Sequence, residues 1–171
     1  MDSTRDLLIK KAYANPSLRQ NILNKGIIYL YCDYSGFIAQ NNYAVACCFV
    51  YNKTISVTAK KLSIENDRGS NYGELFAVLY SLEMLENALK EHQPKTVFIY
   101  TDFSRIEQII SGKYFSNPYY EQIRDEIIAF RNHLQRMYPL IDVKIKYIGR
   151  HKKNNTLHRL AHNASRLAAM E

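Results

Sequence analysis

Two nearly uninterrupted apolar runs stand out along the chain. The first covers Ile27–Cys32 and stops at Asp33, and the second covers Val97–Thr101 and stops at Asp102. A short run that is apolar at almost every position is typical of a strand that is covered on both faces, as in the centre of a sheet. We therefore predict that both segments are inner strands.

Three further segments also predict strands. Tyr43–Tyr51 and Thr54–Leu62 are separated only by Asn52 and Lys53, which is the length of a two-residue hairpin turn. Asp142–Ile148 alternates partly between apolar residues and lysines. Such alternation favours a strand that lies nearer the edge of a sheet.

Apolar residues at helical spacing predict four helices. The clearest covers about residues 71–91, where we expect Asn71 to cap the first turn. The other three are expected from Ser104 to about Ser111, from Tyr119 to just before Pro139, and over residues 157–167. Polar turns and loops are expected at Ser35 and Gly36 with residues 40–42, at 65–70, at 112–118 and at 149–154.

The predicted order of elements is βββαβααβα, which describes a mixed α/β sheet. The later strands follow helical crossovers and must run parallel to a neighbour, with helices covering the faces of the sheet. Residues 1–25 precede this pattern and are expected to form a helical N-terminal extension. We therefore expect one domain over residues 26–171 with an appended extension.

Charge and cysteine content narrow the functional classes. The formal net charge is +7, from 23 Lys and Arg against 16 Asp and Glu, which favours a polyanionic partner such as nucleic acid. No apolar stretch is long enough to cross a membrane, and the first residues do not resemble a secretory signal. Cys32, Cys47 and Cys48 lack disulfide or zinc spacing, so we expect reduced, buried thiols in a cytoplasmic protein.

Acidic residues are expected to meet at one edge of the sheet. Asp33 and Asp102 each follow an inner strand, so parallel pairing would bring them to about one strand spacing, ~5 Å. Glu74 lies in the first turn of the predicted helix 71–91, and His158 lies in the first turn of the last helix. Read singly, the acids could be strand-end, cap or helix-dipole residues. Together they predict a site for Mg²⁺ or Mn²⁺, since a cation relieves their repulsion.

Four short motifs occur in the order found in ribonuclease H of the type 1, retroviral-like branch. The chain resembles this family at Ile28–Gly36 (IYLYCDYSG), Ser70–Ala77 (SNYGELFA), Ile99–Ser104 (IYTDFS) and Asn154–Ala161 (NNTLHRLA). The resemblance covers about residues 27–168. It implies the ribonuclease H-like fold, a five-stranded mixed sheet with helices on both faces.

The resemblance also implies an activity, the hydrolysis of the RNA strand of RNA–DNA hybrids with two metal ions. Asp33 would bridge the two ions, Glu74 and Asp102 would each favour one, and His158 would complete the second site. A bound ion would generate the nucleophile and another would stabilise the leaving oxygen, so no serine or cysteine nucleophile is needed. His151 would act in product release or proton delivery, unless it is only a solvated basic residue.

Three features depart from the family pattern. The aspartate of the fourth motif is replaced by His158, which could ligate metal as a neutral imidazole or could simply pack the last helix. The loop that carries the family's mobile histidine is short and basic here, at residues 149–153. The tryptophan-rich protrusion of some members is absent, because the chain has no tryptophan. The histidine leads us to expect a preference for Mn²⁺.

Substrate contacts are expected around the acids. Asn71 and Ser70 would meet the minor groove of the hybrid, where 2′-hydroxyls distinguish RNA from DNA. The backbone at Ser35 and Gly36 would approach the same site. Basic residues are expected to contact phosphates, and they are Arg150, Lys152, Lys153 and the loop at Lys113. The sequence indicates no obligate protein partner.

Two alternative functions remain open. The chain could be a nucleic-acid-binding module with this fold whose chemistry has decayed, as the His158 and loop departures would permit. It could also be a nuclease of the same fold that acts on another nucleic acid, as DNA exonucleases and junction resolvases do. The three intact acids favour an enzyme, and Asn71 before Glu74 favours the hybrid.

Overall fold

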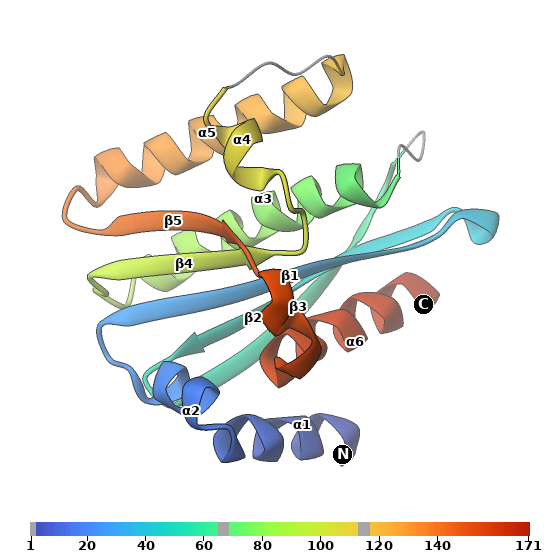
Figure 1. Ribbon diagram of the computed structural model, residues 1–171. Coiled ribbons are helices and arrows are strands. Elements are labelled where there is room, and N and C mark those ends of the chain that lie inside the picture. Colours follow the sequence, from blue (N-terminus) through green and yellow to red (C-terminus); the bar gives the residue numbers. More distant parts are fainter. Residues whose placement is uncertain (1–2, 65–68, 113–116) are drawn as a thin grey trace.

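The computed structural model describes residues 3–64, 69–112 and 117–171 (Figure 1). The predicted loops at 65–70 and 112–118 therefore lie mostly outside the described residues. The elements are α1 (Ser3–Ala14), α2 (Pro16–Leu23), β1 (Ile27–Phe37), η1 (Ile38–Gln40), β2 (Asn42–Tyr51), β3 (Thr54–Leu62), α3 (Ser70–Leu89), β4 (Thr96–Thr101), α4 (Ile106–Ile110), α5 (Pro118–Met137), β5 (Asp142–Tyr147), η2 (Gly149–Asn154) and α6 (Thr156–Met170).

The five strands form one mixed sheet in the order β3-β2-β1-β4-β5 (Figure 1). Strands β1, β2 and β3 form an antiparallel meander, whereas β4 pairs parallel with β1 and β5 pairs parallel with β4. This arrangement confirms the predicted element order and the inner position of β1 and β4. It also confirms that the strand at residues 142–147 lies at an edge.

Strand β1 is longer than the apolar run predicted. It continues through Asp33 to Phe37, so Ser35 and Gly36 lie within the strand and not in a turn. The reason is that β1 has different partners along its length. Pairing with β4 stops at Tyr31, while pairing with β2 continues to Phe37. The polar residue Asp33 therefore follows the end of the pairing between β1 and β4. The prediction that the strand itself ends there was wrong.

The hairpin between β2 and β3 has the predicted two-residue turn. Asn52 and Lys53 have φ angles of 46° and 69°, both in the left-handed region. Two consecutive residues with positive φ are the geometry of the turn that matches the natural twist of a hairpin.

Two predicted helix caps are wrong. Helix α3 begins at Ser70 with Gly69 as its N-cap, at φ 93°, so Asn71 lies inside the first turn. Gly69 makes the entry into the helix because a residue without Cβ adopts this backbone conformation easily. Helix α4 begins at Ile106 with Arg105 as its N-cap, and not after Ser104. In the turn before it, the Thr101 hydroxyl accepts a hydrogen bond from the Phe103 N–H.

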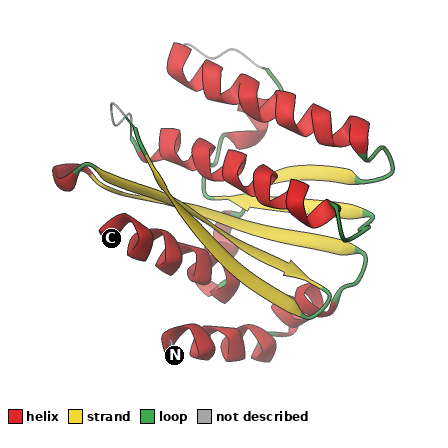
Figure 2. Cartoon of the chain, turned by 180° about the vertical axis from the view of Figure 1, so that it is seen from behind, coloured by secondary structure: helices red, strands yellow, loops and turns green. Residues whose placement is uncertain are grey.

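Helices cover the two faces of the sheet unequally (Figure 2). On one face, α3, α4 and α5 enclose the larger core, which includes Cys32 and Cys47. On the other face, α1, α2 and α6 enclose a smaller core, which includes Cys48. All three cysteines are free and buried, and burial raises the pKa of each thiol, that of Cys47 to about 12.

The first 25 residues contain two helices that pack on the main body of the protein. Asn15 caps α2 by accepting hydrogen bonds from the Ser17 and Leu18 N–H groups. Ile22 of α2 is fully buried, and its carbonyl accepts a hydrogen bond from the Lys53 N–H of the hairpin turn. Within the described ranges, no helix has both the length and the apolar character needed to cross a membrane.

Candidate active site

The acidic residues gather where β1 and β4 part. Asp33 follows the last β1–β4 pair, Tyr31 with Tyr100, and Asp102 follows the end of β4. The Asp33 side chain is almost completely buried, while that of Asp102 is 30% exposed. The parallel neighbours therefore deliver two carboxylates to one edge of the sheet, as the sequence predicted.

Helix α6 holds one oxygen of Asp33 firmly. Oδ2 of Asp33 lies 3.0 Å from Nδ1 of His162 and 3.0 Å from the hydroxyl of Ser165. Ser165 is fully buried and lies 2.7 Å from the hydroxyl of Ser35. The side chain of Ser35 is therefore engaged in supporting this network.

His158 faces the other oxygen of Asp33. Its Nε2 lies 3.7 Å from Oδ1 of Asp33, too far for a hydrogen bond, and this buried nitrogen has no hydrogen-bond partner. Asn155 orients the start of α6 by accepting a hydrogen bond from the His158 N–H. Burial lowers the pKa of His158, and the charge of Asp33 opposes this effect in part. The neutral imidazole is thus the favoured form.

Glu74 lies at the second turn of α3 and not in the first, because the helix begins at Ser70. Its carboxyl is buried, and Oε2 has no hydrogen-bond partner. Burial raises the pKa of Glu74 well above its ordinary value, and the charges of Asp33 and Asp102 raise it further. A hydrogen bond from the backbone of Tyr34 opposes this shift only partly.

A close fit between Tyr34 and two glycines positions Glu74 against β1. A Cβ atom on Gly73 would lie 2.4 Å from the ring of Tyr34, and one on Gly36 would lie 2.6 Å from its hydroxyl. Glycine is therefore required at both positions while Tyr34 keeps its place. The side chain of Tyr34 joins the helix that carries Glu74 to the strand that carries Asp33.

Lys152 lies on η2 beside the acids, and its contact with a phosphate stays a prediction. Its ammonium forms an ion pair with Oδ2 of Asp102 at 2.5 Å, so in this structure it binds an acid and not a phosphate. This hydrogen bond raises the pKa of Lys152. The lysine supplies the positive charge that the three clustered acids require.

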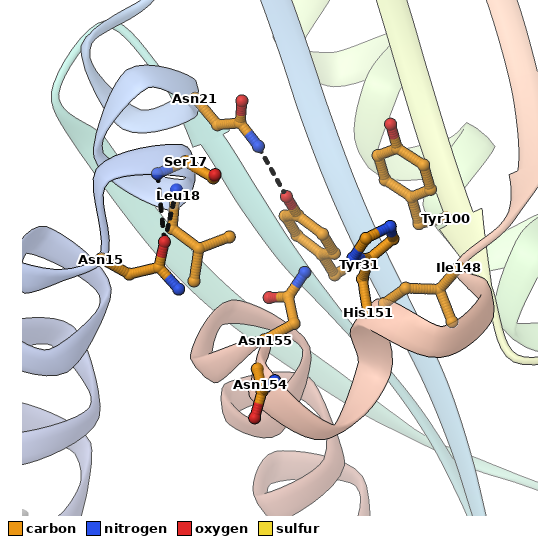
Figure 3. Close-up of a pocket in the computed structure, with 10 residues that line it drawn as sticks. All are labelled: Asn15, Ser17, Leu18, Asn21, Tyr31, Tyr100, Ile148, His151, Asn154 and Asn155. Carbon is orange, nitrogen blue, oxygen red and sulfur yellow. Dashed lines mark hydrogen bonds between the residues drawn. The ribbon is translucent and has the colours of Figure 1, made fainter.

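The remaining predicted residues lie around this cluster without a direct bond to it. Ser70 and Asn71 are exposed at the start of α3, and Arg150, His151 and Lys153 are exposed on η2. His151 lines a cavity with Tyr31 and Tyr100 (Figure 3). Lys113 lies outside the described residues.

His162 and Ser165 were missed in the sequence, although a signal was present. Together with His158 they occur at positions i, i+4 and i+7, which fall on one face of a helix. A polar stripe on an otherwise apolar face of α6 marks the side that meets Asp33.

The donor set suits a divalent cation, although its members are not gathered as ligands. Among the residues that the structure describes, no three His, Cys, Asp or Glu side chains form a ready-made metal group. Yet Glu74 Oε2 and His158 Nε2 are both buried without a hydrogen-bond partner. The ammonium of Lys152 balances the charge of Asp102, as a bound cation would. Carboxylate oxygens are the ligands that Mg²⁺ and Mn²⁺ prefer, so the three acids fit such an ion, and the imidazole suits Mn²⁺ better than Mg²⁺.

No family model matches the chain, and no curated protein matches its sequence. Many solved structures match its fold. RNase H1 of the halophilic archaeon Halobacterium salinarum has 19% identity and a TM-score of 0.58, with 81% of this chain and 97% of that chain covered. LC11-RNase H1, solved in complex with an RNA/DNA hybrid, has 18% identity and a TM-score of 0.57, with 82% and 98% covered.

The N-terminal RNase H domain of a Mycobacterium tuberculosis protein is also similar. It has 15% identity and a TM-score of 0.55, with 85% of this chain and 98% of that chain covered. Each of these domains is matched almost in full, and each is a ribonuclease H. The chain therefore has the ribonuclease H fold.

Proposed function

We propose that the protein is a metal-dependent nuclease that cleaves the RNA strand of RNA–DNA hybrids. The observation that carries this proposal is the buried carboxyl of Glu74, whose Oε2 has no hydrogen-bond partner and which lies beside two further acids. Burying such groups together lowers the stability of the fold, and arrangements of this kind are typical of functional sites. The structural similarity to an RNase H1 that was solved with a hybrid favours the same substrate class.

Asp33, Glu74, Asp102 and His158 would hold the divalent ions. Bound ions would activate water for attack on phosphorus and neutralise the charge that develops on the leaving 3′ oxygen. The protein's own contribution is orientation. His162 and Ser165 fix Oδ2 of Asp33, so that Oδ1 is directed towards the site.

Basic and polar residues would bind the substrate around this centre. Arg150 and Lys153 are exposed on η2, beside the ion pair of Lys152 with Asp102. Lys152 would release Asp102 when an ion binds and would then be free to meet a phosphate. Ser70 and Asn71 are exposed one turn before Glu74, where the 2′-hydroxyls of the RNA strand would be recognised.

The ion pair of Lys152 with Asp102 favours a second candidate function. If Lys152 stayed bound to Asp102, this carboxylate could not ligate a metal ion. The protein would then bind the hybrid without cleaving it. The two candidates differ in a single measurable property, which is whether a divalent ion starts cleavage.

The deciding experiment is a cleavage assay with labelled hybrid, duplex RNA, duplex DNA and single strands, each with Mg²⁺ and with Mn²⁺. We expect cleavage of the hybrid alone. Asp33→Asn should lower its rate by more than about a hundredfold, because the central carboxylate is lost. Asp125→Asn, the same change at an exposed carboxylate of α5, should leave the rate unchanged. Equal rates for Asp33→Asn and wild type would contradict the proposal, and hybrid binding without cleavage would support the second candidate.

A further inference from the structure

Helices cover only half of the sheet face on which α6 lies. Helix α6 packs against β1, β2 and β3, while the helices that pack on β4 and β5 belong to the opposite core. In the described part of the chain no helix lies over β4 and β5 on the α6 side (Figure 1). The side chains on this open area are therefore available for contact.

Two cross-strand rows of similar chemistry run from the covered strand β1 into the open area over β4 and β5. Tyr29, Phe98 and Lys144 are register partners in one row across β1, β4 and β5. Tyr31, Tyr100 and Lys146 are register partners in the next row. Each row thus has an aromatic residue on β1, an aromatic residue on β4 and a lysine on the edge strand.

The four rings form a stacked group, which we call the aromatic ladder: Tyr29, Tyr31, Phe98 and Tyr100. Ring centroids are 5.8 Å apart for Tyr29–Phe98, 5.5 Å for Tyr31–Tyr100 and 5.9 Å for Phe98–Tyr100, with interplanar angles of 15°, 20° and 11°. Phe98 and Tyr100 are half-buried, so part of each ring is open to solvent. Tyr29 and Tyr31 are buried and support the ladder from below, so Phe98 and Tyr100 provide the ring surface on the open part of the sheet.

The ladder adjoins a cavity of about 430 Å³ between α2 and the start of α6, lined by polar and apolar side chains alike (Figure 3). Tyr31 and Tyr100 belong to both the ladder and the cavity wall. Asn21 donates a hydrogen bond to the Tyr31 hydroxyl at 3.3 Å, and Asn155 also lines the cavity. Side-chain amides offer donors and acceptors together, which is the chemistry of a nucleobase edge.

We propose that this face binds a single-stranded segment of nucleic acid, separately from the acidic site. One base would enter the cavity, the next would stack on the exposed ring surface of Phe98 and Tyr100, and phosphates would meet Lys144 and Lys146. Aromatic platforms combined with lysines bind single strands by this combination of forces. The inference goes beyond the proposed cleavage and does not depend on it.

Neighbouring acids do not block the lysines. Lys144 pairs with Asp142 at 3.6 Å, and Lys146 pairs with Glu107 at 3.1 Å. All four side chains are about half exposed, and exposed ion pairs of this kind are weak. A phosphate can therefore replace either carboxylate. Lys144 also lies 5.8 Å from the ring centroid of Phe98, so its charge and the stacking surface act at the same place.

The first test measures binding of labelled single strands of about 12 nucleotides, as RNA and as DNA, by fluorescence anisotropy in the presence of EDTA. Phe98→Leu and Tyr100→Leu should each weaken binding about fivefold or more, the cost of losing one base–ring stack. The double change Lys144→Glu with Lys146→Glu should also weaken it. The same charge change at Lys60 and Lys61, on the opposite edge strand, is the matched control and should have a much smaller effect.

The second test locates the strand directly. Oligonucleotides containing 5-iodouracil, free or as an overhang on a hybrid, should cross-link on irradiation to peptides that contain Phe98 or Tyr100. Binding by Asp33→Asn should equal that of wild type, which separates this inference from the proposed cleavage. Wild-type affinity in both ladder variants, or cross-links confined to other peptides, overturns the proposal. Equal weakening for a blunt hybrid also overturns it, because the face would then belong to the duplex surface.

Discussion

At the scale of single residues, the two oxygens of Asp33 have different surroundings. Oδ2 is engaged by His162 and Ser165, whereas Oδ1 lies 3.7 Å from the unpartnered Nε2 of His158. An imidazole at this position gives the site less negative charge than a fourth carboxylate would. This difference leads to a prediction about metal preference.

We expect Mn²⁺ to support cleavage at lower concentration than Mg²⁺, because Mn²⁺ accepts an imidazole ligand more readily. His158→Asp should shift the preference towards Mg²⁺, and His158→Ala should raise the concentration of either metal that is required. The burial that lowers the pKa of His158 keeps the ring neutral, so an acid limb due to this residue should begin below about pH 6.5. Rate measured against metal concentration decides the matter, and identical curves for wild type and His158→Ala would exclude ligation.

The raised pKa of Glu74 predicts how stability depends on pH without metal. A buried carboxyl with a raised pKa keeps its proton in the folded state and loses it on unfolding, so stability should fall as pH rises above the ordinary value of 4.5. Glu74→Gln removes this effect and should stabilise the metal-free protein at neutral pH by on the order of 1 kcal/mol. Urea unfolding in EDTA at about pH 5 and about pH 8 tests this. The same pH dependence in both proteins would contradict the assignment.

At the scale of elements, the packing of Tyr34 decides how α3 meets β1. Gly73→Ala would ordinarily stabilise a helix by about 1 kcal/mol. Here the new methyl group would overlap the Tyr34 ring, so we expect a loss of about 1–3 kcal/mol instead. Denaturant unfolding of Gly73→Ala, of Tyr34→Leu and of the double variant measures the coupling. Additive losses would show that the two residues do not compete for the same space.

Elements were easier to predict from the sequence than the contacts between them. The apolar runs predicted the inner strands, because a strand that is buried on both faces needs an apolar residue at almost every position. The start of α3 was predicted wrongly because Asn71 is a common cap, whereas Gly69 enters the helix through backbone conformation alone. The pairing of Lys152 with Asp102 joins segments 50 residues apart, and no local pattern records it.

At the scale of the whole molecule, the N-terminal helices share a core with α6. Ile22 of α2 is fully buried in the core that also contains Leu157 and Leu160 of α6. That core supports the helix that carries His158, His162 and Ser165. We therefore expect loss of the packing of α2 to disturb the helix that supports Asp33.

We expect Ile22→Ala to destabilise the whole protein by about 2–5 kcal/mol, as a buried large-to-small change does. Leu7→Ala, at a half-exposed position of α1, should cost less than about 0.5 kcal/mol and serves as the control. Thermal unfolding followed by circular dichroism should show one transition at a lower temperature for Ile22→Ala. An unchanged main transition would mean that the extension unfolds independently.

The three buried thiols allow local opening of the structure to be measured without an added probe. Cys47 lies in the core beneath α3 and α5, while its neighbour Cys48 lies in the core beneath α1, α2 and α6. Because thiolate is the reactive form and burial suppresses it, alkylating reagents can reach these residues only when the corresponding face opens. Labelling rates resolved to the single cysteine, with Cys47 and Cys48 distinguished by fragmenting their shared peptide, would thus time the separation of each helical layer from the sheet, in a chain that has no tryptophan to provide a fluorescence signal.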